Sequence, residues 1–497
     1  MATKILIANR GEIVRRIATT CSKLDIIPCC IYSEADKNSL FIKYCKDAVN
    51  IGGFAPADSY LRMDKIVNAA KQLDCDLVHP GYGFLAENLE FSELCNKEGL
   101  IFVGPSSEAL KISGDKVRAK QVTSRVAPVL EGKEVSNQDE AMRAAYGIGY
   151  PVILKAAKGG GGRGLRVTNS EEELGRVFNS SKNESMIGFG SDRLFVEKYL
   201  EDPRHIEVQI LGDNSAVIHL GERECSVQRR HQKLIEETPS PALTIEMRKS
   251  ITDTAIAIMK EIKYDNAGTV EFLFKDGRFY FMEVNSRIQV EHPITEEVTG
   301  VDIVEQQLHV ATGNGLIIKQ DDVKPKGHAI ECRINAEHPL SFVPFPGTVD
   351  TFLPPEAIGV RVDTALSAGC TISPFYDSLI AKLICWGESR IDTIERMKQS
   401  LYSFRISGIP STIPFHISAL NDSRFLEGNY NTSFIDNLKR YSSKDGEIAS
   451  AILCQLPKKI KFMKNNSYED PWLKSNLSFS NMSSFSHDFF SNSRWNA

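Results

Sequence analysis

Short apolar runs alternate with amphipathic stretches through the first 115 residues of the chain. In the amphipathic stretches the apolar residues recur at the spacing of one helix face, whereas the apolar runs have the length of buried strands. We therefore expect strands at residues 4–8, 26–32, 76–80 and 100–104, with helices at 12–24 and 60–73. This alternation is typical of βαβ units and predicts a parallel sheet.

The pattern changes in the regions that follow. Strands predominate in the second region and are expected at residues 151–155, 194–199, 205–211 and 216–221, before a helix at 244–262. The third region mixes strands with a helix at 389–404, and the last residues are rich in Ser and Asn. The expected organisation is three domains and a poorly ordered tail, at residues 1–115, 116–326, 327–445 and 446–497.

A hairpin is predicted where an Asp-Gly pair separates two β-rich runs, TVEFLF and FYFMEV. If its loop is the three residues 276–278, Glu271 lies opposite Glu283, and Asn285 shares their face because side chains alternate along a strand. An extended chain would continue this polar row to Glu291. Facing carboxylates repel each other, and a divalent cation such as Mg²⁺ would remove that cost. A two-residue loop would instead put Glu271 on the other face, and alternation alone favours an ordinary solvated face.

A glycine-rich loop follows the strand expected at 151–155. Four successive glycines, at 159–162, leave backbone N–H groups unshielded, and such groups can wrap around phosphate oxygens. Lys155 at the strand end could hold a phosphate as a point charge. The loop is not a Walker motif, because no Gly-Lys-Ser/Thr follows. A flexible linker is the alternative, but linkers rarely follow a buried strand and carry Lys and Arg, so we favour phosphate binding.

A basic segment covers residues 222–233. Its five basic side chains are Arg223, Arg229, Arg230, His231 and Lys233. A solvated loop is the usual meaning of such a run. An anion site is the sharper hypothesis, and this segment by itself leaves both open.

Composition narrows the class of protein. Of the 497 residues 42% are hydrophobic and 25% charged, and the net charge of −5 gives no support to nucleic-acid binding. The 11 cysteines include no Cys-x-x-Cys pair, which indicates buried, reduced thiols. No stretch approaches the roughly 20 apolar residues of a membrane helix, and the first apolar run is too short for a signal peptide. We therefore expect a cytoplasmic protein that binds neither membrane nor nucleic acid.

Six motifs occur in order along the chain: ANRGEI, HPGYGFLAEN, GGGGRG, CSVQRRHQK, EVNSRIQVEHPITE and YDSLIAKL. Together they resemble the ATP-grasp superfamily and, within it, the biotin carboxylase family, over residues 1–445. The resemblance implies an α/β chain in three parts. These are an N-terminal parallel-sheet domain that precedes the ATP-grasp, a central ATP-grasp domain with a mobile glycine-rich lid at about 131–204, and a C-terminal α+β domain.

The same resemblance implies roles for individual residues. ATP or cofactor contacts are implied for Lys116, Lys155, Gly161, Gly162, Glu197, Lys198, Tyr199, Leu200, His205, His231, Glu271 and Glu283. The implied metal ligands are Glu271, Glu283 and Asn285. The implied bicarbonate pocket consists of Lys233, Arg287, Gln289 and Val290. The implied catalytic groups are Lys233 and Arg287, with Glu291 as the base that deprotonates bicarbonate and Arg333 as the group that stabilises the biotin enolate.

Biotin carboxylases load CO₂ onto biotin through carboxyphosphate, with ATP, bicarbonate and two Mg²⁺ or Mn²⁺ ions. This chain lacks the Ala-Met-Lys-Met sequence of a biotin attachment site, so biotin is expected on a separate carrier protein. A carboxyltransferase subunit is the second expected partner, and a homodimer is the usual assembly. The final carboxyl acceptor stays open between an acyl-CoA, such as acetyl- or propionyl-CoA, and pyruvate.

Two alternatives remain. One is another bicarbonate-activating ATP-grasp ligase, similar to half of a carbamoyl phosphate synthase, against which the RIQVEHPITE and QRRHQK runs argue. The other is a non-catalytic nucleotide-binding protein, against which the presence of Lys233, Arg287, Glu291 and Arg333 argues.

Overall fold

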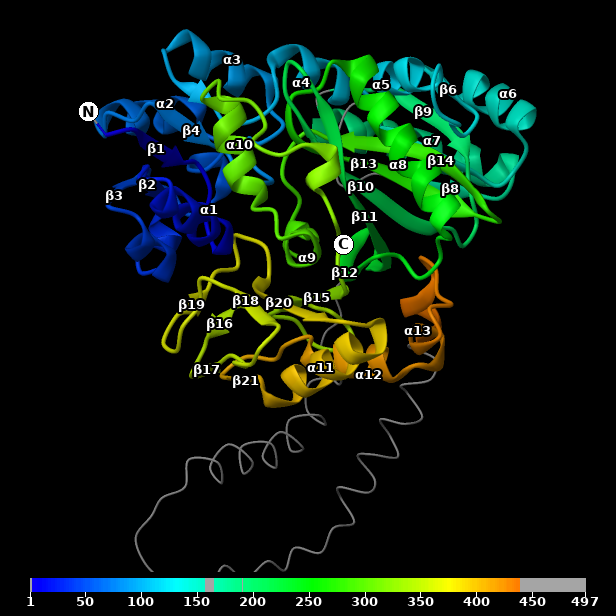
Figure 1. The fold of residues 1–497 in the computed structure, drawn as a ribbon. Coiled ribbons are helices and arrows are strands. Elements are labelled where there is room, and N and C mark those ends of the chain that lie inside the picture. Colours follow the sequence, from blue (N-terminus) through cyan, green and yellow to red (C-terminus); the bar gives the residue numbers. More distant parts are fainter. Residues whose placement is uncertain (1, 157–164, 190, 439–497) are drawn as a thin grey trace, which may run out of the picture. The chain divides into compact units, whose positions relative to one another are not determined.

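The computed structural model of the chain describes residues 2–156, 165–189 and 191–438 (Figure 1). Within these ranges every helix is too short or too polar to serve as a membrane span. Four single-turn 3₁₀ helices occur between the larger elements of the described chain: η1 (Glu34–Asp36), η2 (Leu40–Tyr44), η3 (Pro56–Asp58) and η4 (Gln320–Asp322).

The first sheet is parallel, as predicted, with strand order β3-β2-β1-β4-β5. Its strands are β1 (Lys4–Ile7), β2 (Ile27–Tyr32), β3 (Asp47–Asn50), β4 (Leu77–His79) and β5 (Ile101–Phe102). The helices of this region are α1 (Glu12–Lys23), α2 (Met63–Gln72), α3 (Leu89–Lys97) and α4 (Ser107–Ser113). Successive residues of β1 enter different cores, Ile5 and Ile7 with α1 and Leu6 with α2 and α3, which explains the continuous apolar runs. Strand β5 is shorter than the run 100–104, because Gly104 and Pro105 follow it.

A smaller sheet follows, with strand order β6-β9-β7-β8. Its strands are β6 (Gly132–Val135), β7 (Val152–Ala156), β8 (Arg166–Thr168) and β9 (Leu194–Lys198). Helix α5 (Lys116–Thr123) precedes this sheet, and α6 (Gln138–Ile148) and α7 (Glu171–Phe189) pack against it around Leu174 and Phe178. The glycines at 159–162 belong to the β7–β8 connection and lie outside the described residues.

The largest sheet has eight antiparallel strands in the order β14-β13-β10-β11-β12-β15-β20-β18. Its strands are β10 (Arg204–Gly212), β11 (Val217–Arg229), β12 (Gln232–Thr238), β13 (Asn266–Lys275), β14 (Arg278–Asn285), β15 (His328–Asn335), β18 (Val360–Asp363) and β20 (Leu379–Gly387). Strand β12 pairs with β15, so the sheet continues across residue 326, and side chains from either side of that position share one surface. Residues 222–229 continue strand β11, so this part of the basic segment is not a loop.

The helices around this sheet are α8 (Ile245–Ile262), α9 (His292–Thr299) and α10 (Ile303–Ala311). The remaining strands form two short ladders, β16 (Gly347–Thr348) with β19 (Thr371–Ile372) and β17 (Thr351–Leu353) with β21 (Arg405–Ser407). The last described helices are α11 (Arg390–Ser403), α12 (Ile413–Asn421) and α13 (Ser423–Leu426). Together with β15 and β20, helices α11 and α12 enclose one apolar core (Figure 1).

The predicted hairpin forms, but the three-residue loop is wrong. Lys275 pairs with Arg278 across the two-residue turn Asp276-Gly277. A two-residue turn would have moved Glu271 out of register with Glu283, but a β-bulge after Glu271 shifts the pairing back by one residue. Glu271 therefore lies opposite Glu283 after all.

Candidate active site

A fully buried group of carboxylates surrounds the ammonium group of Lys233. Its Nζ lies 2.5 Å from Glu207 Oε2, 2.8 Å from Glu271 Oε1 and 2.7 Å from Glu291 Oε1. These side chains come from β12, β10, β13 and the loop that precedes α9, and the three strands lie within four consecutive positions of the large sheet. Burial alone would lower the pKa of Lys233, but the three carboxylates raise it well above its usual value, and the ammonium group stays charged.

Glu291 is held between two cations. One carboxylate oxygen contacts Lys233, and the other accepts a hydrogen bond from Arg333 Nη2 at 2.7 Å. Glu291 has no exposed surface, and burial alone would raise its pKa. Lys233, Arg333 and Arg223 outweigh this effect and hold the pKa of Glu291 well below its usual value. Glu291 is therefore ionised at neutral pH and able to accept a proton.

Arg333 is fixed at both ends of its guanidinium group. Its Nε donates to Glu236 Oε1 at 2.6 Å, while Nη2 donates to Glu291. Its backbone carbonyl accepts from Thr412 Oγ1 and lies 2.7 Å from His416 Nε2, both at the start of α12. Burial raises the pKa of Glu236 to about 7, although Arg333 acts in the opposite direction.

The loop between β14 and α9 carries a chain of polar contacts. The strand ends at Asn285, so the polar row does not continue as extended strand. Arg287 nevertheless donates to Asn285 Oδ1 at 3.1 Å and to Gln289 Oε1 at 2.9 Å, and Gln289 donates to Glu271 Oε1 at 3.0 Å. The loop thereby brings the predicted pocket residues into contact with the predicted metal ligands.

The predicted metal ligands supply hard oxygen donors on one face of the hairpin. Glu271 and Glu283 are directly opposite each other, and Asn285 is two residues further along β14. Burial would raise the pKa of Glu271, but Lys233 and His205 lower it, so this carboxylate is ionised. Nδ2 of Asn285 is buried and has no hydrogen-bond partner within the described chain, which leaves a donor for a phosphate oxygen. Two carboxylates and an amide oxygen next to such a donor fit Mg²⁺ or Mn²⁺ that also holds a nucleotide phosphate.

Several of the predicted ATP contacts have side-chain partners in the structure. Glu197 pairs with both Lys155 and Lys120, which lowers the pKa of Glu197 against the effect of burial. His205 Nε2 lies 2.9 Å from Glu271 Oε2, so His205 joins the group around Lys233. Lys198 instead donates to the carbonyl oxygens of Gly149 and Tyr150 and supports the backbone of the small sheet.

The remaining predicted ATP contacts lie in connections between strands or outside the described residues. Tyr199 and Leu200 follow β9, and His231 lies at the β11–β12 turn. Gly161, Gly162 and the side chain of Lys116 lie outside what the structure describes.

Some residues of this site were not predicted. Arg223, although part of the basic segment, is a fully buried side chain that contacts Glu207, Gln209 and Thr295. Glu87, from the HPGYGFLAEN motif, accepts from the Ser286 backbone N–H at 3.0 Å and from Arg287 Nε at 2.9 Å. Nothing in the spacing of Glu87 signals a contact with a residue 200 positions away.

Family comparisons match the chain in three consecutive segments. Residues 1–110 match the N-terminal domain of biotin carboxylase, residues 115–319 the ATP binding domain of the carbamoyl-phosphate synthase L chain, and residues 331–437 the C-terminal domain of biotin carboxylase.

Relatives with similar sequences span nearly all of this part of the chain. A pyruvate carboxylase subunit from Methanothermobacter thermautotrophicus is 49% identical over 445 residues, which is 88% of this chain and 91% of that protein. Biotin carboxylase 1 of Bacillus subtilis is 48% identical over 88% of this chain and 98% of its own length.

Solved structures agree with this fold. The biotin carboxylase–β-γ-ATP complex from Campylobacter jejuni has a TM-score of 0.86 at 44% identity, covering 88% of this chain and 99% of that one. A second similar structure is the biotin carboxylase domain dimer of Hydrogenobacter thermophilus 2-oxoglutarate carboxylase, solved with MgADP, ADP and bicarbonate. Its TM-score is 0.86 at 45% identity, and the match covers 88% of this chain and 98% of that one. The predicted arrangement of a parallel N-terminal sheet, a central ATP-grasp domain and a C-terminal α+β domain is thereby confirmed.

Proposed function

The chain belongs to the biotin carboxylase family, and we propose that it carboxylates biotin with ATP and bicarbonate, the biotin being attached to a separate carrier protein. The observation that carries this proposal is Glu291, a fully buried carboxylate with its pKa held low between Lys233 and Arg333. Because Glu291 is ionised, it has a free lone pair for the remaining proton of bicarbonate, and its place beside Lys233 and Arg333 puts that lone pair next to an anion site.

The first step is the activation of bicarbonate by Glu291. Bicarbonate is a weak nucleophile, and it becomes a better one when its proton passes to a Glu291 carboxylate oxygen. A carbonate oxygen then attacks the γ-phosphorus of ATP, and ADP leaves with the electron pair of the broken P–O bond. Lys233, which contacts Glu291, and the paired side chains of Arg287 and Gln289 would neutralise or hydrogen-bond the anion.

Glu271, Glu283 and Asn285 would hold the divalent cations, Mg²⁺ or Mn²⁺. Bound there, the ions would neutralise charge on the phosphate oxygens of ATP. We propose that Lys116, Lys155, His205 and His231 contact the nucleotide together with Gly161, Gly162 and residues 197–200. Lys155 already lies beside a carboxylate, Glu197, that can orient it toward a phosphate.

Arg333 serves the second step. Carboxyphosphate releases CO₂ and phosphate, the phosphate takes the biotin N–H proton, and the resulting enolate captures CO₂. When Glu291 has accepted a proton it is neutral and holds Arg333 less strongly, so the guanidinium group becomes available to the enolate oxygen. Glu236 keeps Arg333 in place meanwhile.

The partners we propose are a biotin carrier protein and a carboxyltransferase. Relatives named as subunits of pyruvate carboxylase and of 2-oxoglutarate carboxylase support a multi-subunit assembly. The dimer of the Hydrogenobacter domain supports a homodimer. The ten described cysteines are all free thiols, which supports a reducing compartment such as the cytoplasm.

ATP hydrolysis by the purified chain with Mg²⁺ tests the proposal. We expect hydrolysis that requires bicarbonate and that free biotin stimulates. Equal hydrolysis with and without biotin would indicate a ligase similar to carbamoyl phosphate synthase. Residues 115–319 match the ATP binding domain of that enzyme, so this alternative is tested directly. No hydrolysis under any of these conditions would indicate a non-catalytic nucleotide-binding protein.

The variant Glu291→Gln tests the assignment of the base. Because the amide cannot accept the bicarbonate proton, we expect the biotin-stimulated rate to fall on the order of 100-fold or more, while ATP still binds. Glu261→Gln, an exposed glutamate on α8, is the control and should retain the full rate. A Glu291→Gln enzyme with the wild-type rate would contradict the assignment.

A further inference from the structure

Lys382, near the middle of β20, is a fully buried lysine that none of the roles proposed above includes. Its Nζ donates to the backbone carbonyl of Val290 at 3.0 Å and lies 2.9 Å from Glu12 Oε1. These contacts join segments that are far apart in the sequence: α1, the loop before α9, and β20. Burying an ammonium group costs free energy of folding unless the group is paired, so a function of this position is to be sought in its contacts.

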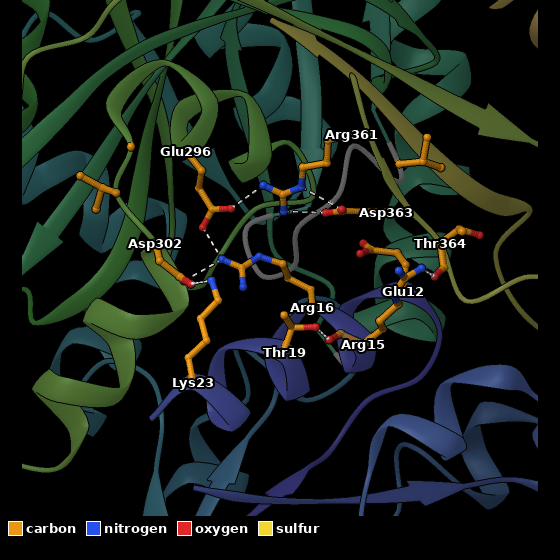
Figure 2. Close-up of a pocket in the computed structure, with 13 residues that line it drawn as sticks. Glu12, Arg15, Arg16, Thr19, Lys23, Glu296, Asp302, Arg361, Asp363 and Thr364 are labelled. Atoms are coloured by element: carbon orange, nitrogen blue, oxygen red, sulfur yellow. Dashed lines mark hydrogen bonds and ion pairs between the residues drawn. The ribbon is translucent and has the colours of Figure 1, made fainter. Parts of the chain in front are cut away.

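The pairing of Lys382 is specific. Glu12 lines a pocket of about 410 Å³ together with Arg16 and Arg361, and Figure 2 shows these side chains. Both arginines contact other acids there: Arg16 binds Glu296 and Asp302, and Arg361 binds Glu296 and Asp363, as the dashed lines mark. Lys382 lies 2.9 Å from Glu12 and 3.8 Å from Asp363 Oδ2, so Glu12 is its nearer acidic partner, and Tyr82 donates its hydroxyl to the same oxygen of Glu12.

Lys382 is charged in this environment. Burial alone would lower its pKa, but Glu12, Glu331 and Asp363 raise the pKa above the usual value for lysine. A charged donor forms a stronger hydrogen bond to the Val290 carbonyl than a neutral amine would.

The Val290 carbonyl belongs to the loop that carries the bicarbonate pocket. At its start this loop is held by Glu87, which binds the Ser286 backbone and the Arg287 side chain. Near its end, the backbone N–H groups of His292 and Ile294 contact the carbonyls of Gln289 and Glu291 only at 3.4 Å, which is long for such bonds. The 3.0 Å bond from Lys382 therefore holds the peptide unit that joins Val290 to Glu291.

We propose that Lys382 is a positioning residue for the bicarbonate step, fixing the Val290–Glu291 peptide so that the base and the Arg287–Gln289 pocket keep their relative placement. This inference rests on the proposed function of the same site. Lys382 itself has no surface open to a substrate, so it acts through the loop and not as a catalytic group. Glu12 keeps the ammonium group charged and correctly aimed.

The variant Lys382→Met tests this role, because it keeps the length and apolar stem of the side chain and removes the charge and the donors. We expect kcat/KM for bicarbonate to fall on the order of 100-fold, as a displacement of reacting groups by about 1 Å can cause. The Kd of Mg·ATP, measured by calorimetry, should stay unchanged, because the predicted nucleotide contacts do not touch Lys382. Lys382→Arg, which retains charge and donors, should recover part of the loss.

A double variant separates positioning from mere stabilisation by an ion pair. Lys382→Met leaves Glu12 buried without its cation, which can lower stability, whereas Lys382→Met with Glu12→Gln removes both charges. We expect the double variant to regain thermal stability but to keep the low kcat/KM for bicarbonate. Full recovery of kcat/KM in the double variant, or no loss in Lys382→Met, would overturn the inference. Wild-type enzyme without bicarbonate-dependent hydrolysis would instead refute the proposed function itself.

Discussion

Individual residues of this site owe their properties to charges that water does not reach. Glu207, Glu271 and Glu291 all lie within 2.8 Å of Lys233, and all are buried. Two of them, Glu271 and Glu291, have lowered pKa values, whereas burial raises the pKa of Glu207 despite Arg223 and Lys233. Neighbouring carboxylates in one cluster thus have pKa values shifted in opposite directions, because burial and the surrounding charges balance differently at each of them.

Glu237 allows a test of such burial through the pH dependence of stability. It accepts from His328 at 2.6 Å, from Arg390 at 2.7 and 2.9 Å, and from the Tyr430 hydroxyl. Burial opposes its ionisation, but His328 and Arg390 lower the pKa of Glu237 to about 2. The folded state therefore binds a proton more weakly than the unfolded state does. The resulting stabilisation is complete above the unfolded pKa of about 4.5 and is lost as pH falls toward 2.

We therefore expect Glu237→Gln to lower the thermal unfolding midpoint at pH 7, where the ionised pair contributes at most about 3 kcal/mol. The difference in thermal unfolding midpoint between wild type and variant should be smaller at pH 4, because wild type has by then lost about 1 kcal/mol of this contribution. Thermal unfolding at both pH values measures the difference, with exposed Glu261→Gln as the control. A difference that stays constant between pH 7 and pH 4 would contradict the assignment.

At the scale of elements, the β13–β14 hairpin decides where the proposed metal ligands lie. Its turn has both central residues at positive φ, Asp276 at 51° and Gly277 at 74°, which is the geometry of a two-residue hairpin turn. Such a turn alone would misplace Glu271, and the bulge opposite Phe272 corrects the register. The turn and the bulge therefore act as a pair.

Gly277→Ala tests the contribution of this turn. Its φ of 74° is strained for a residue with a Cβ, so we expect a loss of about 1 kcal/mol in unfolding free energy. The matched control is Gly147→Ala in helix α6, where an added Cβ meets no atom within 4 Å and should stabilise the protein by about 0.5–1 kcal/mol. Chemical denaturation measures both, and equal effects of the two substitutions would contradict the turn geometry.

At the scale of the whole molecule, the site is assembled from residues that range from 87 to 382 in the described chain. Glu87 comes from the N-terminal region, Lys233 and Glu291 from the centre, and Arg333 and Lys382 from the C-terminal region. The continuous eight-stranded sheet makes this possible, because β12 and β15 are neighbours in it. Ligand binding should therefore stabilise the folded molecule as a unit.

Metal removal tests this linkage. With Mg·ATP at 100 times its Kd, we expect stabilisation of about 2.7 kcal/mol and a corresponding rise in the thermal midpoint. Chelation of Mg²⁺ with EDTA should remove most of the rise, because Glu271 and Glu283 then face the phosphates without a neutralising ion. In the Glu283→Gln variant, the thermal midpoint measured with Mg·ATP should differ less from the midpoint measured with ATP and EDTA. An unchanged difference in that variant would place the metal elsewhere.

Much of the fold follows from local pattern. The apolar runs of the first 115 residues specify strands buried on both faces, and the alternation along β14 puts Glu283 and Asn285 on one face. These periodicities of about 3.6 and 2 residues are properties of the backbone, so a sequence displays them directly. The motif order likewise indicated the family, because each motif is contiguous.

Only the tertiary structure decided which side chains meet. The contacts Glu87–Arg287, Arg333–Glu291 and Lys382–Val290 join residues whose separation along the chain carries no periodic signal. The bulge after Glu271 was equally hidden, since no residue type marks it and only the pairing of two strands reveals it. The sequence by itself therefore determined most of the elements and most of the chemical groups that the site contains. The packing of sheets and loops determined their pairings and hence their charge states, because a pKa depends on burial and on neighbours brought together by the fold.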